Sequence, residues 1–131
     1  MGGLELALLC LALNVYFESR GESYEGQLAV AHVTLNRSRA KQRSVCEEVY
    51  SPYQFSWTSQ ITFPPEPSEQ AWINAQNVSR LAYQTNDPTG GALWYHRYDI
   101  TPWWVWNKVV VRRIDKHVFY KCKPKHYCEW R

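Results

Sequence analysis

Two acidic residues four positions apart, Glu18 and Glu22, occupy a short polar break in the first forty residues. A long apolar run ends in Tyr16 and Phe17 and is followed directly by Glu18. Burial beside aromatic side chains disfavours the carboxylate anion, so the pKa of such an acid rises and the acid keeps a proton near neutral pH. We therefore predict that Glu18 is a general acid.

Glu22 is the nearest candidate for a second carboxylate, and it has a structural alternative. Gly21 interrupts the helical pattern, so a spacing of four does not place the two acids on one face. Glu22 can instead place an anion at the N-terminus of a helix that begins near Tyr24. We expect Glu22→Gln to keep measurable activity and Glu18→Gln to lose nearly all of it.

Aromatic residues are abundant, with seven Trp and nine Tyr, and they cluster at residues 55–57, 94–98 and 103–106. Aromatic rings stack on the C–H faces of sugars, and they also fill protein cores. Both roles stay open for Phe55 and Trp57.

Several polar residues are candidates for substrate binding or for support of the site. Gln27 follows Glu18 on the next helix, from which its amide can hydrogen-bond a substrate. Tyr95 and His96 follow a turn and can reach a groove. Arg20 is expected to hold Glu22 or a backbone carbonyl, and we expect the pair Asn36–Arg37 to make structural bonds at a helix end.

The elements that must position these residues are mainly helices. Residues 4–17 are apolar nearly all round and predict a buried central helix, with Gly21 as its left-handed stop. Residues 24–37 follow a helical period, and Ser44 and Glu47 form a capping box for a short helix. Ser68 is expected to cap a third long helix whose apolar face includes Trp72.

The later part of the chain predicts a small sheet. Residues 53–58 indicate a loop or a short strand, and residues 87–91 (DPTGG) indicate a turn. Residues 92–96, 109–111 and 117–121 predict short strands. The fold class is therefore α+β, a mainly helical domain with a small late β-sheet, and we expect one domain over residues 1–131.

Composition and charge limit the possible partners. With 45% hydrophobic and 21% charged residues, the chain has the composition of a globular protein. Residues 108–131 hold eight Lys or Arg and two acidic residues, a local net charge of +6. A basic end favours contact with an anionic cell envelope, while the lack of a recognisable nucleic-acid motif argues against nucleic acid.

The apolar run at residues 4–17 has no Lys or Arg before it and contains Glu5, so it does not read as a signal peptide. It is also too short to span a bilayer. We expect synthesis in the cytoplasm and action on the cell wall, in the periplasm or envelope.

The four cysteines leave their pairing open. Cys10 lies in the apolar helix and is expected to be a buried thiol, whereas Cys122 and Cys128 can close a short loop. A zinc site built from these two cysteines with His117 and His126 is the alternative, but the spacing fits no standard pattern and the surrounding lysines repel a cation. We expect no metal and no cofactor, and His117 is expected in the core or in support of the site.

Five blocks of the sequence, in order, resemble the SleB/CwlJ-type cell wall hydrolases. They are NVYFESRGE at residues 14–22, YEGQLAVA with LNR at 24–37, YQFSW at 53–57, DPTGGALWYH at 87–96 and HVFY at 117–120. The resemblance covers nearly the whole chain. A bare domain of this kind looks like a phage endolysin or a small CwlJ-like hydrolase, and host cell lysis is expected ahead of spore germination.

The resemblance implies a lysozyme- or transglycosylase-like fold, peptidoglycan glycan strands as the partner, and a monomer. Glu18 stands at the position of the family's essential Glu. In a lytic transglycosylase this acid protonates the bond between N-acetylmuramic acid and N-acetylglucosamine. It then acts as base on the C6 hydroxyl of the same sugar, which gives a 1,6-anhydro end. Two alternatives remain, lysozyme-type hydrolysis and a glycan-binding module without activity.

Overall fold

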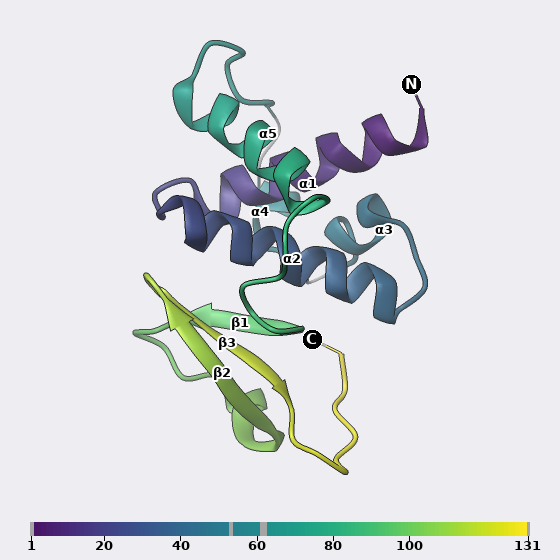
Figure 1. Cartoon of the computed structure of the whole chain (residues 1–131), viewed down its shortest axis with the longest axis vertical. Coiled ribbons are helices and arrows are strands. Elements are labelled where there is room, and N and C mark those ends of the chain that lie inside the picture. The colour runs from purple at the N-terminus through teal and green to yellow at the C-terminus, as the bar shows by residue number, and fades with distance from the viewer. Residues whose placement is uncertain (1, 53, 61–62, 131) are drawn as a thin grey trace.

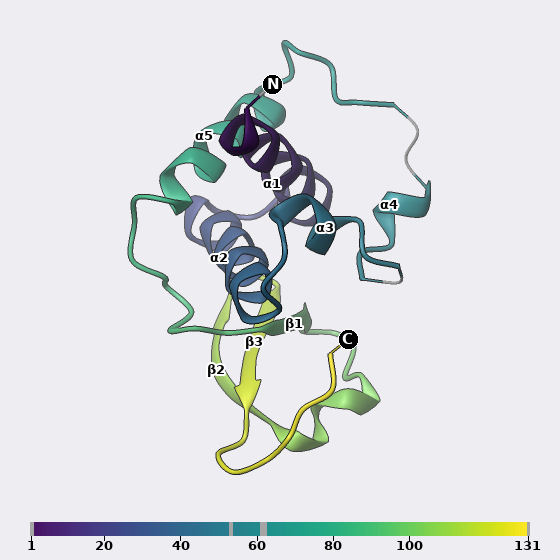
Figure 2. The same cartoon turned by 90° about the vertical axis from the view of Figure 1, so that its right-hand side faces the viewer.

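The computed structural model describes residues 2–52, 54–60 and 63–130, and it places the helices on one side and a three-stranded sheet on the other (Figure 1, Figure 2). This confirms the predicted α+β class with a late sheet. Within the described residues, none of the helices has the length and apolar character needed to cross a membrane. The elements in chain order are α1 (Gly3–Ser19), α2 (Tyr24–Ala40), α3 (Val45–Val49), α4 (Trp57–Gln60), α5 (Gln70–Ala82), β1 (Trp94–Arg97), the 3-10 helix η1 (Trp103–Asn107), β2 (Lys108–Ile114) and β3 (His117–Cys122).

Helix α2 is the centre of the fold. On one side it packs with α1, α3 and α5 in the larger hydrophobic core. On the other side Val30 and Val33 pack against the sheet, together with Phe119. The prediction of a buried first helix packed on several sides is correct for the second half of α1, where Leu11 and Val15 are fully buried. It is wrong for the start of α1, because Leu4 and Leu6 are 63% and 46% exposed. Apolar composition does not reveal which faces of a helix are covered.

The predicted cap at the start of α3 is correct, but the predicted N-cap of α5 and the predicted end of α1 are not. The capping box of Ser44 and Glu47 is present at the start of α3. Helix α5, however, begins after Glu69 without a side-chain cap, so Ser68 is not its N-cap. Helix α1 ends at Ser19 with a right-handed C-cap at Arg20, and the left-handed glycines of the chain are Gly90 and Gly91 instead of Gly21.

The sheet is antiparallel with strand order β1-β3-β2. All three predicted strands are present, and β2 is longer than predicted. The predicted turn at residues 87–91 is closed by Asp87, whose carboxylate accepts bonds from the backbone N–H groups of Thr89 and Gly91, both at 2.8 Å. The predicted loop or strand at residues 53–58 instead leads into helix α4, with residue 53 outside the described residues.

Two disulfides tie distant and neighbouring parts of the chain together. Cys10 of α1 is bonded to Cys46 of α3, so the predicted buried thiol was wrong. Cys122 and Cys128 close the short loop after β3, one of the possibilities left open. The sequence does not predict the first pair, whose cysteines are 36 residues apart. The packing of α3 on α1 brings their Cα atoms to 5.3 Å.

Candidate active site

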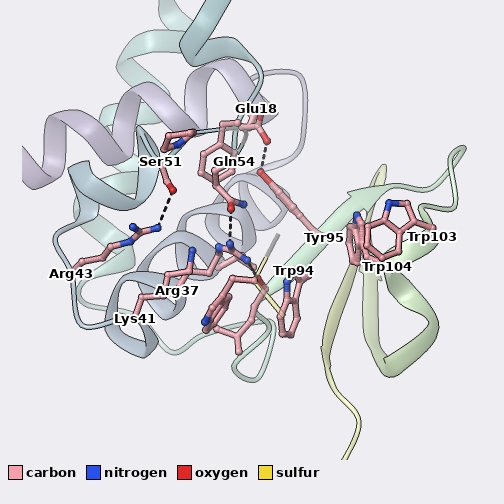
Figure 3. A pocket seen from close by; sticks show the side chains of 15 residues that line it. Glu18, Arg37, Lys41, Arg43, Ser51, Gln54, Trp94, Tyr95, Trp103 and Trp104 are labelled. Carbon is pink, nitrogen blue, oxygen red and sulfur yellow. Dashed lines mark hydrogen bonds between the residues drawn. The ribbon is translucent and has the colours of Figure 1, made fainter. Parts of the chain in front are cut away.

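Glu18 lies in the last turn of α1 and faces a cleft between the helices and the sheet (Figure 3). The cleft has a volume of about 720 Å³, and α2, the segment before α4, β1 and η1 also contribute side chains to it. A volume of this size accommodates a ligand of several rings. Among the described residues that line the cleft, Glu18 is the one carboxylate.

Tyr95 of β1 is the direct partner of Glu18. Its hydroxyl donates to Glu18 Oε1 at 2.5 Å. Burial raises the pKa of Glu18, and the bond from Tyr95 lowers it by a smaller amount, so the net shift is upward. Burial, together with the neighbouring Glu18, raises the pKa of Tyr95 well above its usual value, so the phenol remains a donor. The pair therefore holds a protonatable carboxyl in one orientation.

The turn after Glu18 is fixed from two directions. The amide of Gln27 donates to the backbone oxygens of Glu22 and Arg20, at 3.2 and 3.5 Å. From the sheet, Asp115 in the turn between β2 and β3 accepts bonds from both the backbone and the hydroxyl of Ser23, at 2.8 and 2.5 Å. The hairpin is thereby docked onto the start of α2.

Gly26 permits this docking. A Cβ atom at this position would lie 2.6 Å from the Asp115 carboxylate, which is closer than real contacts allow. A side chain at position 26 would force the Asp115 carboxylate out of its bonds with Ser23.

Glu22 faces the hairpin and does not line the cleft. Its carboxylate accepts a bond from the backbone of Lys116 at 3.2 Å and lies 3.1 Å from His117 Nδ1. Burial lowers the pKa of His117, so the ring is neutral near pH 7, and its Nδ1 makes no hydrogen bond with the carboxylate. The His117 ring stacks on Tyr95 with 5.0 Å between ring centroids. Glu22 thus supports the residue that holds Glu18.

Glu22 therefore does not join Glu18 in the cleft, and it lies just before the N-terminus of α2 without capping it. The N-cap of α2 is Ser23, whose hydroxyl accepts from the backbone of Gly26. Arg20 was also assigned the wrong partner, because it binds Glu69 at 3.2 Å and the hydroxyl of Tyr16. Such contacts depend on how α5 and the hairpin pack against α1, which the local sequence does not show.

The opposite end of the cleft from Glu18 is basic. Arg37, Lys41 and Arg43 line it, and all three contact the carboxylate of Glu48, which is 0% exposed. Burial raises the pKa of Glu48, but the bonds from Arg37 and Lys41 together outweigh burial and hold it below its usual value. Glu48 is therefore an anion.

Comparison with known proteins agrees with the resemblance in the sequence. Residues 21–120 match the model of the family described as Cell Wall Hydrolase, a match that begins three residues after Glu18. The chain belongs to this cell wall hydrolase family. It is 38% identical over 117 residues to the spore cortex-lytic enzyme of Bacillus cereus and 37% identical over 115 residues to that of Halalkalibacterium halodurans.

These two alignments cover 85% and 83% of this chain but 42% and 33% of the relatives, so the chain spans less than half of their length. Two solved structures are similar over most of both chains. The catalytic domain of Bacillus cereus SleB aligns with a TM-score of 0.74 and 34% identity, covering 89% of this chain and 91% of that one. The catalytic domain of the germination-specific lytic transglycosylase SleB from Bacillus anthracis aligns with a TM-score of 0.73 and 35% identity, covering 88% and 93%. The likeness confirms the predicted lysozyme-like α+β fold.

Three of the seven predicted site residues line the cleft of this cell wall hydrolase, namely Glu18, Phe55 and Tyr95. Trp57 is a core residue that stacks on Phe17 and donates to Asn14 Oδ1 at 2.8 Å. His96 lies outside the cleft lining and pairs with the Tyr120 hydroxyl at 2.8 Å.

Glu22, Gln27, Trp57 and His96 do not line the cleft. Gln27 is 5% exposed, and its amide nitrogen donates to two backbone oxygens of the turn. Its predicted position facing the substrate was wrong, because the turn that follows α1 folds over the Gln27 amide.

Sequence reasoning missed several residues that line the cleft. Arg37 was assigned to structural bonds, which it makes with Glu48, Leu93 O and Gln54, but it also borders the cavity. Its spacing of four from Lys41 was a usable signal, because such residues share a helix face. Trp94, Trp103 and Trp104 belong to the aromatic clusters noted in the sequence, but none of them was named as a site residue. No signal in the sequence pointed to Arg43 or Trp130.

The zinc alternative loses two of its candidate ligands in this hydrolase. Cys122 and Cys128 are joined to each other, and a disulfide sulfur is not the thiolate that binds zinc. Across the part of the chain that the structure describes, no three His, Cys, Asp or Glu side chains gather closely enough to hold a metal ion.

Proposed function

We propose that this chain cleaves the glycan strand of peptidoglycan between N-acetylmuramic acid and N-acetylglucosamine, with Glu18 as the acid. The observation that carries the proposal is a single half-buried carboxyl with a raised pKa, held by Tyr95 in a cleft large enough for several sugar rings. Family membership and the likeness to two SleB catalytic domains support it.

The product is proposed to be a 1,6-anhydro end, formed by lytic transglycosylation. Hydrolysing glycosidases use two carboxylates, placed about 5–5.5 Å apart in retaining enzymes and further apart in inverting ones. Here the other nearby acids are engaged elsewhere, because Glu22 contacts Lys116 and His117, and Glu48 is surrounded by cations. A single acid that first protonates the leaving oxygen and then accepts the proton of the C6 hydroxyl needs no second carboxylate.

Aromatic residues at the rim of the cleft complete the proposed glycan site. Trp103 is 67% exposed, and Trp103 and Trp104 border the cavity close to Tyr95 (Figure 3). Indole faces of this kind stack on sugar rings, so we assign these two residues to glycan binding.

Mass spectrometry of the products tests the reaction. Purified peptidoglycan is digested to completion, and muramyl ends are analysed for the anhydro form, which is one water lighter than the hydrolytic form. Anhydro ends support transglycosylation, and reducing ends that carry the additional water favour lysozyme-type hydrolysis. If the turbidity of a peptidoglycan suspension stays as high with the native protein as with Glu18→Gln, the result favours a glycan-binding module.

The proposed place of action is the cell wall, outside the reducing cytoplasm, with host cell lysis as the setting. All four cysteines are in disulfides, which persist in oxidising compartments. Exposed cations of the basic region at residues 108–131, among them Lys121, Lys123 and Lys125, are proposed to contact an anionic envelope. Wall binding by the monomer should then weaken from low to high salt, and binding that stays constant contradicts this contact.

A further inference from the structure

The basic end of the cleft is formed by Arg37, Lys41 and Arg43, and we call it the cationic end. Arg37 and Lys41 lie one turn apart near the end of α2, and Arg43 follows in the loop before α3. Their contacts with Glu48 are 2.8 Å from Arg37 Nε, 2.9 Å from Lys41 Nζ and 3.0 Å from Arg43 Nη2. Figure 3 shows the three side chains along the same wall of the cleft.

The charges at this end do not balance. Three cations share one carboxylate, which leaves a surplus of two positive charges in a partly enclosed site. Among the described residues that line the cleft, the one carboxylate is that of Glu18, which is bonded to Tyr95 and has a raised pKa. Like charges held together away from water repel one another, so an added anion at this end is stabilised.

Donor groups at the cationic end remain accessible from the cleft. Arg43 uses Nε and Nη2 on Glu48 and Ser51, and among the described residues nothing accepts a bond from its Nη1. Its side chain is 32% exposed, and that of Lys41 is 11% exposed. A guanidinium with unused N–H groups matches the geometry of a carboxylate.

An aromatic wall borders the same end. Trp130 lies 4.9 Å from both the Arg37 guanidinium and the Lys41 ammonium, measured to the ring centroid, and it stacks on Trp94 at 5.4 Å. The disulfide between Cys122 and Cys128 closes the loop two residues before Trp130. A ring that binds here can stack on an indole while an acidic substituent reaches the cations.

We propose that the cationic end is a subsite for a carboxylate carried by the glycan substrate. The inference rests on the proposed function, which it deepens by naming the group recognised. Two sources of a carboxylate exist in peptidoglycan. One is the lactyl group of muramic acid where no peptide is attached, and the other is the peptide itself.

Binding of soluble glycan fragments to the Glu18→Gln variant, measured by calorimetry, tests the subsite without turnover. Three fragments of equal sugar length are compared. The first has no peptide and carries free lactyl carboxylates, the second is the same fragment with its lactyl groups amidated, and the third carries the peptide. Amidation should weaken binding about 10–100-fold, the range for charge-assisted hydrogen bonds. Tighter binding of the peptide-free fragment assigns the lactyl source, and tighter binding of the peptide-bearing fragment assigns the peptide.

Lys41→Gln and Arg39→Gln in the same background form a matched pair. Each removes one positive charge near the end of α2, but Arg39 is exposed and does not line the cleft. Lys41→Gln should bind the charged and amidated fragments with nearly equal, weak affinity, and Arg39→Gln should keep the full difference. If Lys41→Gln fails to fold, Arg43→Gln carries the same expectation.

Equal binding of all three fragments by Glu18→Gln overturns the subsite, as does an equal loss in the Lys41 and Arg39 variants. This outcome is distinct from failure of the proposed function. In that case the native chain releases no product from peptidoglycan, whatever the fragments bind.

Discussion

Glu18 lines one end of the cleft and Glu48 lies behind the cations of the other end, and the pKa values of these two acids shift in opposite directions. Glu18 has a neutral phenol as its partner, and burial raises its pKa. Glu48 is more deeply buried, yet its pKa is lowered because three cations contact it. Burial alone therefore does not make a proton donor. The charge of the partners decides whether a buried acid serves in chemistry or in structure.

The largest expected effect is on catalysis. Glu18→Gln removes the transferable proton while keeping the shape and the bond from Tyr95, so kcat for release of muramyl products should fall about 10²–10⁴-fold. Urea unfolding at neutral pH should show no loss of stability. Full activity of this variant would remove Glu18 from the mechanism.

Glu48→Gln should produce the reverse result. Three cations would lose their shared anion, and removing one partner of a buried ion pair costs about 3–5 kcal/mol in the free energy of unfolding. Urea denaturation measures the loss, and Glu47→Gln on the exposed side of the same helix serves as the control. A Glu48→Gln protein as stable as the native one would show that the cations do not depend on this carboxylate.

Tyr95→Phe tests the partner of Glu18. The lost hydrogen bond should lower kcat about tenfold, the equivalent of one neutral hydrogen bond. Because the Tyr95 bond lowers the pKa of Glu18, its removal raises that pKa further. Activity requires protonated Glu18, so the fall of kcat with rising pH should move to higher pH. An unchanged pH profile of kcat would show that Tyr95 does not influence the pKa of Glu18.

The smallest effect is the pH dependence of stability. The pKa of Glu18 is raised on folding, so ionisation costs stability as pH rises above about 4.5, the ordinary value. Glu18→Gln should therefore match the native protein in acid and exceed it in stability at neutral pH, as measured by urea unfolding. For Glu48 the sign is opposite, because its lowered pKa stabilises the fold above pH 4.5 and this gain is lost as pH falls. Identical curves for native protein and Glu18→Gln would contradict the raised pKa.

Local sequence was enough to predict what depends on neighbours along the chain. The helical period at residues 24–37, the capping box at Ser44 and the turn at residues 87–91 are all present. Glu18 was identified from its place at the end of an apolar run, and the structure places it in the cleft with a raised pKa.

Tertiary packing decided the partners. Tyr95 reaches Glu18 from 77 residues away, and Arg37 meets Glu48 only because α3 folds back onto α2. Trp130 lines the cleft because the loop after β3 returns to Trp94. The sequence by itself determined the long helices and the turns, because these follow from short-range sterics, hydrogen bonding and periodicity. Which carboxylate has a raised pKa and which one has a lowered pKa depends on groups that long-range packing alone brings within a few ångströms.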